Sequence, residues 1–167
     1  MSSRDTPAFS NHRGLPVAVS SCTAALHLAL KAVGIEKDDE VITVSHSFIS
    51  TANSIRYCGA NPVFVDIEPE TYNIDPNLIE EAISNKTKAI LCVHQMGMPC
   101  DLNAILKIAK QYSLAVIEDA ACAAGSEIKL GNKWEKIGLM LIRLQGKFFQ
   151  QKMYLLYYTW FEKMFRH

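Results

Sequence analysis

The chain has 167 residues, enough for one domain with a hydrophobic core, and its 17 basic and 17 acidic residues give a formal net charge of +0. This balance argues against a protein that binds nucleic acids or membrane surfaces, since both classes usually carry an excess of basic residues. Five cysteines without a C-x-x-C pair, and no apolar run before residue 138 long enough to span a bilayer, indicate reduced thiols and a cytoplasmic location.

Residues 15–138 alternate short β-branched runs with amphipathic segments, a pattern that predicts an α/β domain with a mostly parallel sheet and flanking helices. The expected strands cover residues 16–19, 40–44, 62–65, 89–93 and 115–117. The expected helices cover residues 23–33, 50–57, 76–83 and 102–112. Ligands of such sheets bind where a strand ends and the next loop or helix begins, so we expect the chemistry there.

Residues 139–167 break this pattern, while residues 1–14 form a short N-terminal tail before it. The final segment holds eight of the 15 aromatic residues, and five Lys or Arg against one acid. One interpretation is a basic amphipathic surface helix for membrane or partner contact. We favour another, a sequence that was not selected to complete this fold, such as an out-of-frame or truncated product, because the α/β pattern stops unfinished. Membrane contact by this tail is therefore not expected.

Three segments that follow predicted strands carry candidate chemistry. Residues 20–25, SSCTAA, open a predicted helix, where backbone N–H groups and hydroxyls hold a phosphate or simply cap the helix. Glu118 and Asp119 end a hydrophobic strand, where a carboxylate pairs with a pyridinium nitrogen or serves as a cap or structural ion pair. Phe48 stacks on a flat ring or fills the core, and core is the commoner role. We expect His94 to be a hydrogen-bonded structural histidine.

Taken in order, five motifs resemble one family. They are VAVSSCTAALHLAL at 17–30, DEVI at 39–42, PVFVDI at 62–67, VHQMG at 93–97 and IEDAA at 117–121. Together they look like the sugar aminotransferases of the DegT/DnrJ/EryC1/StrS group, over about residues 15–138. The resemblance implies an incomplete fold-type-I aminotransferase large domain that binds pyridoxal 5'-phosphate. Members transfer an amino group, typically from glutamate, to a keto carbon of a nucleotide-activated sugar, usually as homodimers.

The resemblance also implies roles for individual residues. Carried over by position, Cys22 and Thr23 bind the cofactor phosphate. Phe48 stacks on the pyridine ring, and Asp119 pairs with the ring nitrogen, which keeps the ring protonated as an electron sink. Members often have glycine or alanine at Cys22 and glutamine at Cys122. Cys122 is therefore a cofactor-binding candidate whose role stays open.

The catalytic residue is not identifiable from this sequence. Family members continue with a Gly-Asp segment and a Phe-Ser-Phe run that ends in the lysine to which the cofactor is joined, whereas residues 139–147 here read LMLIRLQGK. Lys147 and Lys152 lie at suitable distances along the chain but lack the family's flanking residues. We therefore expect an inactive fragment of an aminotransferase. Two alternatives stay open: a noncatalytic binding or interaction module, and a relative of the sugar dehydratases that carry histidine at the lysine position.

Overall fold

The computed structural model describes residues 17–137, 140–143 and 153–157. Its centre is a seven-stranded sheet, with order β1-β9-β8-β5-β4-β2-β3 among the described residues, and four of the six strand pairs are parallel. These strands are β1 (Val17–Val19), β2 (Glu40–Val44), β3 (Asn61–Val65), β4 (Thr87–Val93), β5 (Ala115–Asp119), β8 (Met140–Arg143) and β9 (Met153–Tyr157). The expected mostly parallel α/β fold is confirmed.

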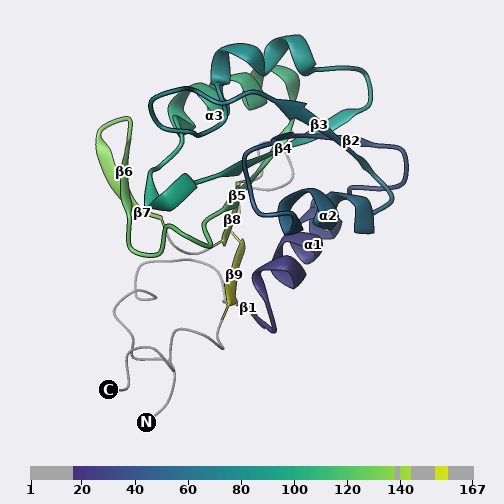
Figure 1. Ribbon diagram of the computed structural model, residues 1–167, viewed down its shortest axis with the longest axis horizontal. Coiled ribbons are helices and arrows are strands. Elements are labelled where there is room, and N and C mark those ends of the chain that lie inside the picture. The colour runs from purple at the N-terminus through teal and green to yellow at the C-terminus, as the bar shows by residue number, and fades with distance from the viewer. Residues whose placement is uncertain (1–16, 138–139, 144–152, 158–167) are drawn as a thin grey trace.

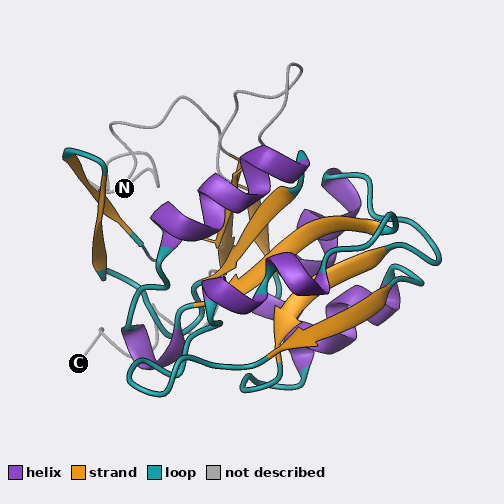
Figure 2. Cartoon of the chain, turned by 90° about the horizontal axis from the view of Figure 1, so that it is seen from above, coloured by secondary structure: helices purple, strands orange, loops and turns teal. Residues whose placement is uncertain are grey.

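Helices cover both faces of this sheet, as Figures 1 and 2 show. The α-helices are α1 (Cys22–Ala32), α2 (Ser50–Tyr57) and α3 (Leu102–Tyr112). In Figure 1, α1 and α2 lie together below the strands and α3 lies above them. Both α2 and α3 begin and end where the sequence predicted, and α1 begins and ends one residue earlier than expected. None of the helices in the described part of the chain is long and apolar enough to cross a membrane.

Side-chain caps fix the starts of the two longer helices. The Ser21 hydroxyl accepts a hydrogen bond from the Ala24 N–H at 3.1 Å, and the Asp101 carboxylate accepts one from the Ala104 N–H at the same distance. Each helix then places apolar residues at helical spacing against the sheet, and these are buried. They are Ala25, Leu26, Ala29 and Leu30 in α1, and Leu102, Ile105, Ile108 and Ala109 in α3.

The core of the molecule follows the central strands. Residues 89–92 of β4 are fully buried, as are Val116 and Ile117 of β5 and Val41 and Ile42 of β2. A parallel strand covered by helices on both faces buries both sets of its side chains, which explains the continuous hydrophobic runs in the sequence. This rigid centre carries the strand ends on which the candidate site is built.

The helix expected at residues 76–83 is not an α-helix. Two short 3₁₀ segments replace it, η2 (Pro76–Leu78) and η3 (Glu80–Ala82). Within residues 76–83, only Ile79 is fully buried. Burial of one apolar side chain does not offset the free-energy cost of nucleating an α-helix over so few residues, whereas a 3₁₀ turn orders only about three residues.

The final segment contributes two strands that the sequence analysis did not predict. β8 pairs antiparallel with β5 and with β9, and β9 pairs parallel with β1. Neither segment forms the surface helix that we considered. β8 reads MLIR and β9 reads MYLLY, two short and mostly apolar runs, and β5 and β1 offer backbone groups for pairing. Lys147 and Lys152 lie outside the described residues.

A small hairpin, also unpredicted, projects beside the main sheet in both views (Figures 1 and 2). It consists of β6 (Glu127–Leu130) and β7 (Lys133–Lys136), paired antiparallel. Gly131 opens its two-residue turn with a φ of +58°, a conformation that favours glycine. The signal that we overlooked was this Gly-Asn pair between two short runs.

Candidate cofactor-binding site

The candidate site lies at one edge of the sheet, where β1, β2 and β5 end. α1 begins shortly after β1, residues 45–49 lead from β2 into α2, and β5 ends at Asp119. Residues far apart in the sequence meet here, since the Cys22 thiol lies 3.6 Å from Asp119 Oδ1, 97 positions further along the chain. The structure therefore brings together two of the residues that the resemblance selected.

Asp119 is the centre of this site. Its side chain is 5% exposed and accepts hydrogen bonds from three donors. The Cys22 thiol at 3.6 Å and the Ala121 N–H at 3.1 Å both donate to Oδ1, while the Thr51 hydroxyl at 3.1 Å donates to Oδ2. A carboxylate accepts at about four positions, so this set leaves one, on Oδ2. A cationic N–H donor such as a pyridinium suits that position, because it would also neutralise the buried charge.

Thr51 is held in turn by a second hydroxyl. Ser47 Oγ lies 2.7 Å from Thr51 Oγ1, and Thr51 is 1% exposed. Neither residue was singled out from the sequence, because a Ser and a Thr after a strand are ordinary loop and helix-start residues. The only available signal was their position after a strand of a parallel sheet.

The start of α1 suits an anion. The Ser21 hydroxyl occupies the Ala24 N–H, but the first N–H groups of any α-helix, here those of Cys22 and Thr23, have no partner within the helix. These N–H groups carry the positive end of the helix dipole and bind phosphate in many proteins. Ser21 is thus the N-cap, while Cys22 and Thr23 remain candidates for phosphate binding.

Phe48 does not fill the core, although a phenylalanine after a strand more often does. Its side chain is 78% exposed, and it lies on the loop that holds Ser47. The core interpretation is therefore wrong for this residue. A phenyl ring on the surface, next to the segment that contacts Asp119, is available for stacking on a flat ligand.

The two cysteines of the site differ in their surroundings. Burial is the largest cause that raises the pKa of Cys22, to about 12, and the neighbouring charge and hydrogen bond of Asp119 raise it further. Cys22 is therefore a protonated thiol that donates to Asp119 at neutral pH. Cys122 is exposed and lies near enough for its own charge to contribute to that raised pKa. Cys122 thus lies near Cys22, and its role in binding the cofactor stays a prediction.

His94 is a structural residue, as expected. Its Nδ1 accepts a hydrogen bond from the Cys100 N–H at 3.0 Å, so Nε2 carries the proton that faces Glu118 Oε2 at 3.1 Å. Both side chains are buried. Glu118 thus belongs to a buried polar pair beneath the site, which leaves Asp119 as the carboxylate at the strand end.

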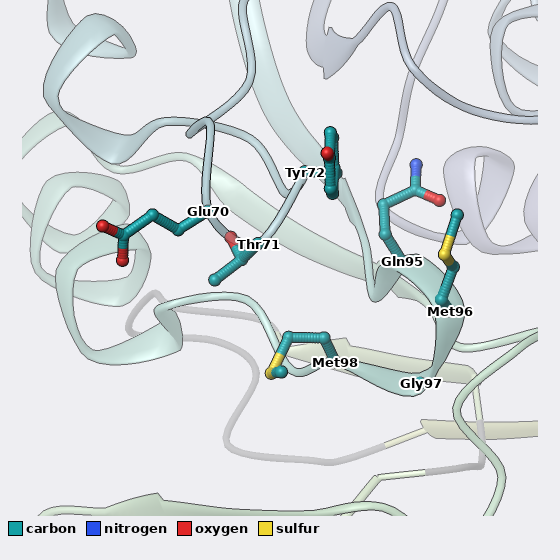
Figure 3. A pocket seen from close by; sticks show the side chains of 7 residues that line it. All are labelled: Glu70, Thr71, Tyr72, Gln95, Met96, Gly97 and Met98. Atoms are coloured by element: carbon teal, nitrogen blue, oxygen red, sulfur yellow. The ribbon is translucent and has the colours of Figure 1, made fainter.

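A hollow of about 360 Å³ lies between residues 70–72 and residues 95–98, whose side chains Figure 3 shows. Gln95 donates to the His46 backbone oxygen and the His46 and Tyr72 rings lie 5.7 Å apart, so the hollow borders the loop that follows β2. Its lining includes exposed apolar side chains, Met96 at 82% and Met98 at 51%. The residues that line it are Glu70, Thr71, Tyr72, Gln95, Met96, Gly97 and Met98.

Residues 8–141 match the DegT/DnrJ/EryC1/StrS aminotransferase family. The chain belongs to this family. It is 49% identical over 122 residues to the GDP-perosamine synthase of Escherichia coli O157:H7, covering 73% of this chain and 34% of that protein. It is 54% identical over 113 residues to the spore coat polysaccharide biosynthesis protein SpsC of Bacillus subtilis, covering 68% of this chain and 29% of that protein.

The chain also resembles solved structures. The structure of NtdA from Bacillus subtilis with bound cofactor PMP has a TM-score of 0.60 and 48% identity, covering 60% of this chain and 23% of that one. The structure of 3-amino-5-hydroxybenzoic acid synthase has a TM-score of 0.66 and 34% identity, covering 72% and 30%. The expected family and aminotransferase fold are thereby confirmed. The chain spans about a third of the length of the curated relatives it matches.

Proposed function

We propose that this chain forms the cofactor-binding half of a nucleotide-sugar aminotransferase site that takes pyridoxal 5'-phosphate. The observation that carries the proposal is the contact set of Asp119, a buried carboxylate held by three donors with one acceptor position left. In this assignment Asp119 binds the ring nitrogen and keeps it protonated. Cys22 and Thr23 bind the phosphate at the start of α1, and Phe48 covers one face of the ring.

The cofactor, when bound, supplies an electron-accepting ring on which an amino group is exchanged. The described residues of this chain supply its orientation. Anchoring at the phosphate end and at the ring nitrogen leaves one orientation for the ring, and Phe48 restricts its tilt. The substrates in this proposal are a nucleotide-activated keto sugar and an amino donor such as glutamate, in line with the relatives named GDP-perosamine synthase.

Two parts of the proposal concern the assembled protein. We propose a homodimer, which is supported by exposed apolar side chains beside the site, Phe48 at 78%, Ile49 at 62% and Met96 at 82%. We also propose that this chain by itself does not turn over, since neither Lys147 nor Lys152 has the family's flanking residues. Light scattering coupled to size-exclusion chromatography tests the first part. Borohydride reduction followed by peptide mass spectrometry tests the second, and a pyridoxyl adduct on either lysine would contradict it.

The decisive experiment is a titration of the purified chain with pyridoxal phosphate, followed by fluorescence and absorbance. We expect Asp119→Asn to weaken binding by about tenfold or more, because a neutral amide replaces a charged partner of the ring nitrogen. Asp75→Asn is the matched control, since it also removes one acidic charge and keeps a capping side chain at η2. Equal affinities of Asp119→Asn and the parent chain would sink the proposal.

A second candidate function has one observation in its favour. β8 and β9 of the divergent segment pair with β5 and β1, so part of that segment joins the sheet. A noncatalytic binding or interaction module would use such a completed sheet as a scaffold. A chain that remains folded and monomeric, and shows no affinity for pyridoxal phosphate up to millimolar concentration, would favour this function over the first.

A further inference from the structure

We infer that Thr51 is a positioning residue that holds the Asp119 carboxylate in place for the ring nitrogen, and that Ser47 orders the Thr51 hydroxyl. The inference rests on the proposed function, and it extends that function to two residues outside the resemblance. It follows from the directions of the two hydrogen bonds that Thr51 makes, and from which Asp119 oxygen each donor reaches.

The directions are fixed by the ionised carboxylate, which only accepts. The Thr51 hydroxyl must therefore give its proton to Asp119 Oδ2, at 3.1 Å. Since that proton is committed, the contact of 2.7 Å between the two hydroxyls requires Ser47 to donate and Thr51 to accept. The result is a one-way chain from Ser47 through Thr51 to Asp119, with no alternative orientation for the middle hydroxyl.

The two carboxylate oxygens have different partners. Cys22 and Ala121 both donate to Oδ1, whereas Thr51 donates to Oδ2. Oδ2 is also the oxygen with an acceptor position left for a ligand. Without the Thr51 hydroxyl, the carboxylate is held on one side only and can turn about its Cβ–Cγ bond, since such terminal torsions have broad minima. Thr51 therefore sets the direction of the oxygen that the ring nitrogen needs.

Thr51 also anchors the loop that carries the stacking ring. Its backbone N–H donates to the Phe48 carbonyl oxygen at 3.0 Å, so Phe48 and the Thr51 hydroxyl belong to the same turn at the start of α2. Thr51 is buried and Phe48 is exposed on this turn. One residue thus links the contact with the ring face to the contact with the ring nitrogen.

The test compares Thr51→Val, which removes the hydroxyl and keeps the shape, with Thr51→Ser, which keeps it. Thr43→Val is the matched control, because the buried Thr43 hydroxyl bonds to the Leu91 backbone oxygen and not to Asp119. We expect Thr51→Val to weaken pyridoxal phosphate binding by about three- to tenfold, the usual effect of one buried hydrogen bond. Thr51→Ser and Thr43→Val should stay within about twofold of the parent chain.

A second readout needs no cofactor. The Ala121 N–H donates to Asp119 Oδ1, so its NMR resonance and its hydrogen-exchange rate report the carboxylate position. Both should change in Thr51→Val, return in Thr51→Ser and stay unchanged in Thr43→Val. An unchanged Ala121 amide in Thr51→Val, or a serine variant as weak as the valine variant, would overturn the inference. If the parent chain fails to bind pyridoxal phosphate, the proposed function fails, and the Ala121 amide alone decides whether Thr51 positions Asp119.

Discussion

The raised pKa of Cys22 makes this thiol the most informative chemical probe of the site. Burial is the main cause, followed by the charge and the hydrogen bond of Asp119, and together they raise the pKa to about 12. At pH 8 a thiol with a pKa of about 9 is roughly one-tenth thiolate, while one with a pKa of about 12 is roughly a ten-thousandth thiolate. Because only the thiolate reacts, Cys22 should be alkylated about a thousandfold more slowly than an ordinary thiol.

Iodoacetamide labelling of the native chain at pH 8, followed by peptide mass spectrometry, measures this difference. The exposed Cys122 is the internal reference in the same molecule. Asp119→Asn removes the charge while burial stays, so it should lower the pKa of Cys22 and speed its labelling. Equal rates for Cys22 and Cys122 in the parent chain, or no acceleration in Asp119→Asn, would refute the reasoning.

The same shift has a consequence for stability at alkaline pH. The folded pKa of Cys22 lies above its unfolded value of 9, so its protonated thiol stabilises the folded state fully below about pH 9. This contribution is lost as the pH rises from about 9 toward about 12, because the unfolded chain ionises first. Cys22→Ala should therefore show a smaller loss of stability than the parent chain across this range in urea denaturation.

Three further predictions concern the packing that supports the site, each checked by urea denaturation at pH 7. Leu26→Ala should cost about 2–5 kcal/mol because Leu26 is fully buried, whereas Leu28→Ala, at a half-exposed position, should cost less than about 1 kcal/mol. His94→Ala should cost about 1–3 kcal/mol, since it removes a buried hydrogen-bond partner of Glu118, and no measurable cost would contradict a stabilising role for this contact. Ser21→Ala should cost about 1 kcal/mol through the lost cap, and Ser21→Asn should recover most of it.

Hydrophobic pattern predicted most of the fold because the elements that it marks are buried. β2 and α3 have the predicted bounds, since β2 is a continuous buried run and α3 buries its apolar residues at helical spacing. α2 also begins and ends as predicted, although Ile55 is the one apolar residue among its three buried residues. The prediction failed at residues 76–83, where one buried anchor supports only 3₁₀ turns. It also failed for β8 and β9, because their runs carry no alternation and strand pairing depends on which edge lies nearby.

The candidate site was less predictable, since residue type alone does not reveal orientation. Asp119 and Cys22 were selected through the resemblance, and the structure brings them into contact. For Phe48, residue type alone favoured the core and the resemblance favoured stacking on the ring, and its exposure contradicts only the core interpretation. Thr51 was not selected at all, although it makes the only described contact to Asp119 Oδ2. Hydroxyl residues are common in loops, so their function emerges only when the folded chain shows what they face.

The proposed function separates cofactor recognition from covalent attachment. The donors that hold Asp119 come from residues 22, 51 and 121, and all three lie on the described α/β body. The lysine candidates, Lys147 and Lys152, belong to a segment without the family's flanking sequence. In the proposed function, affinity for pyridoxal phosphate therefore depends on contacts that the body already makes, whereas turnover would need a lysine outside these contacts. For this reason binding lost in Asp119→Asn, combined with no reducible adduct, is the outcome that we expect from the titration and the borohydride experiment together.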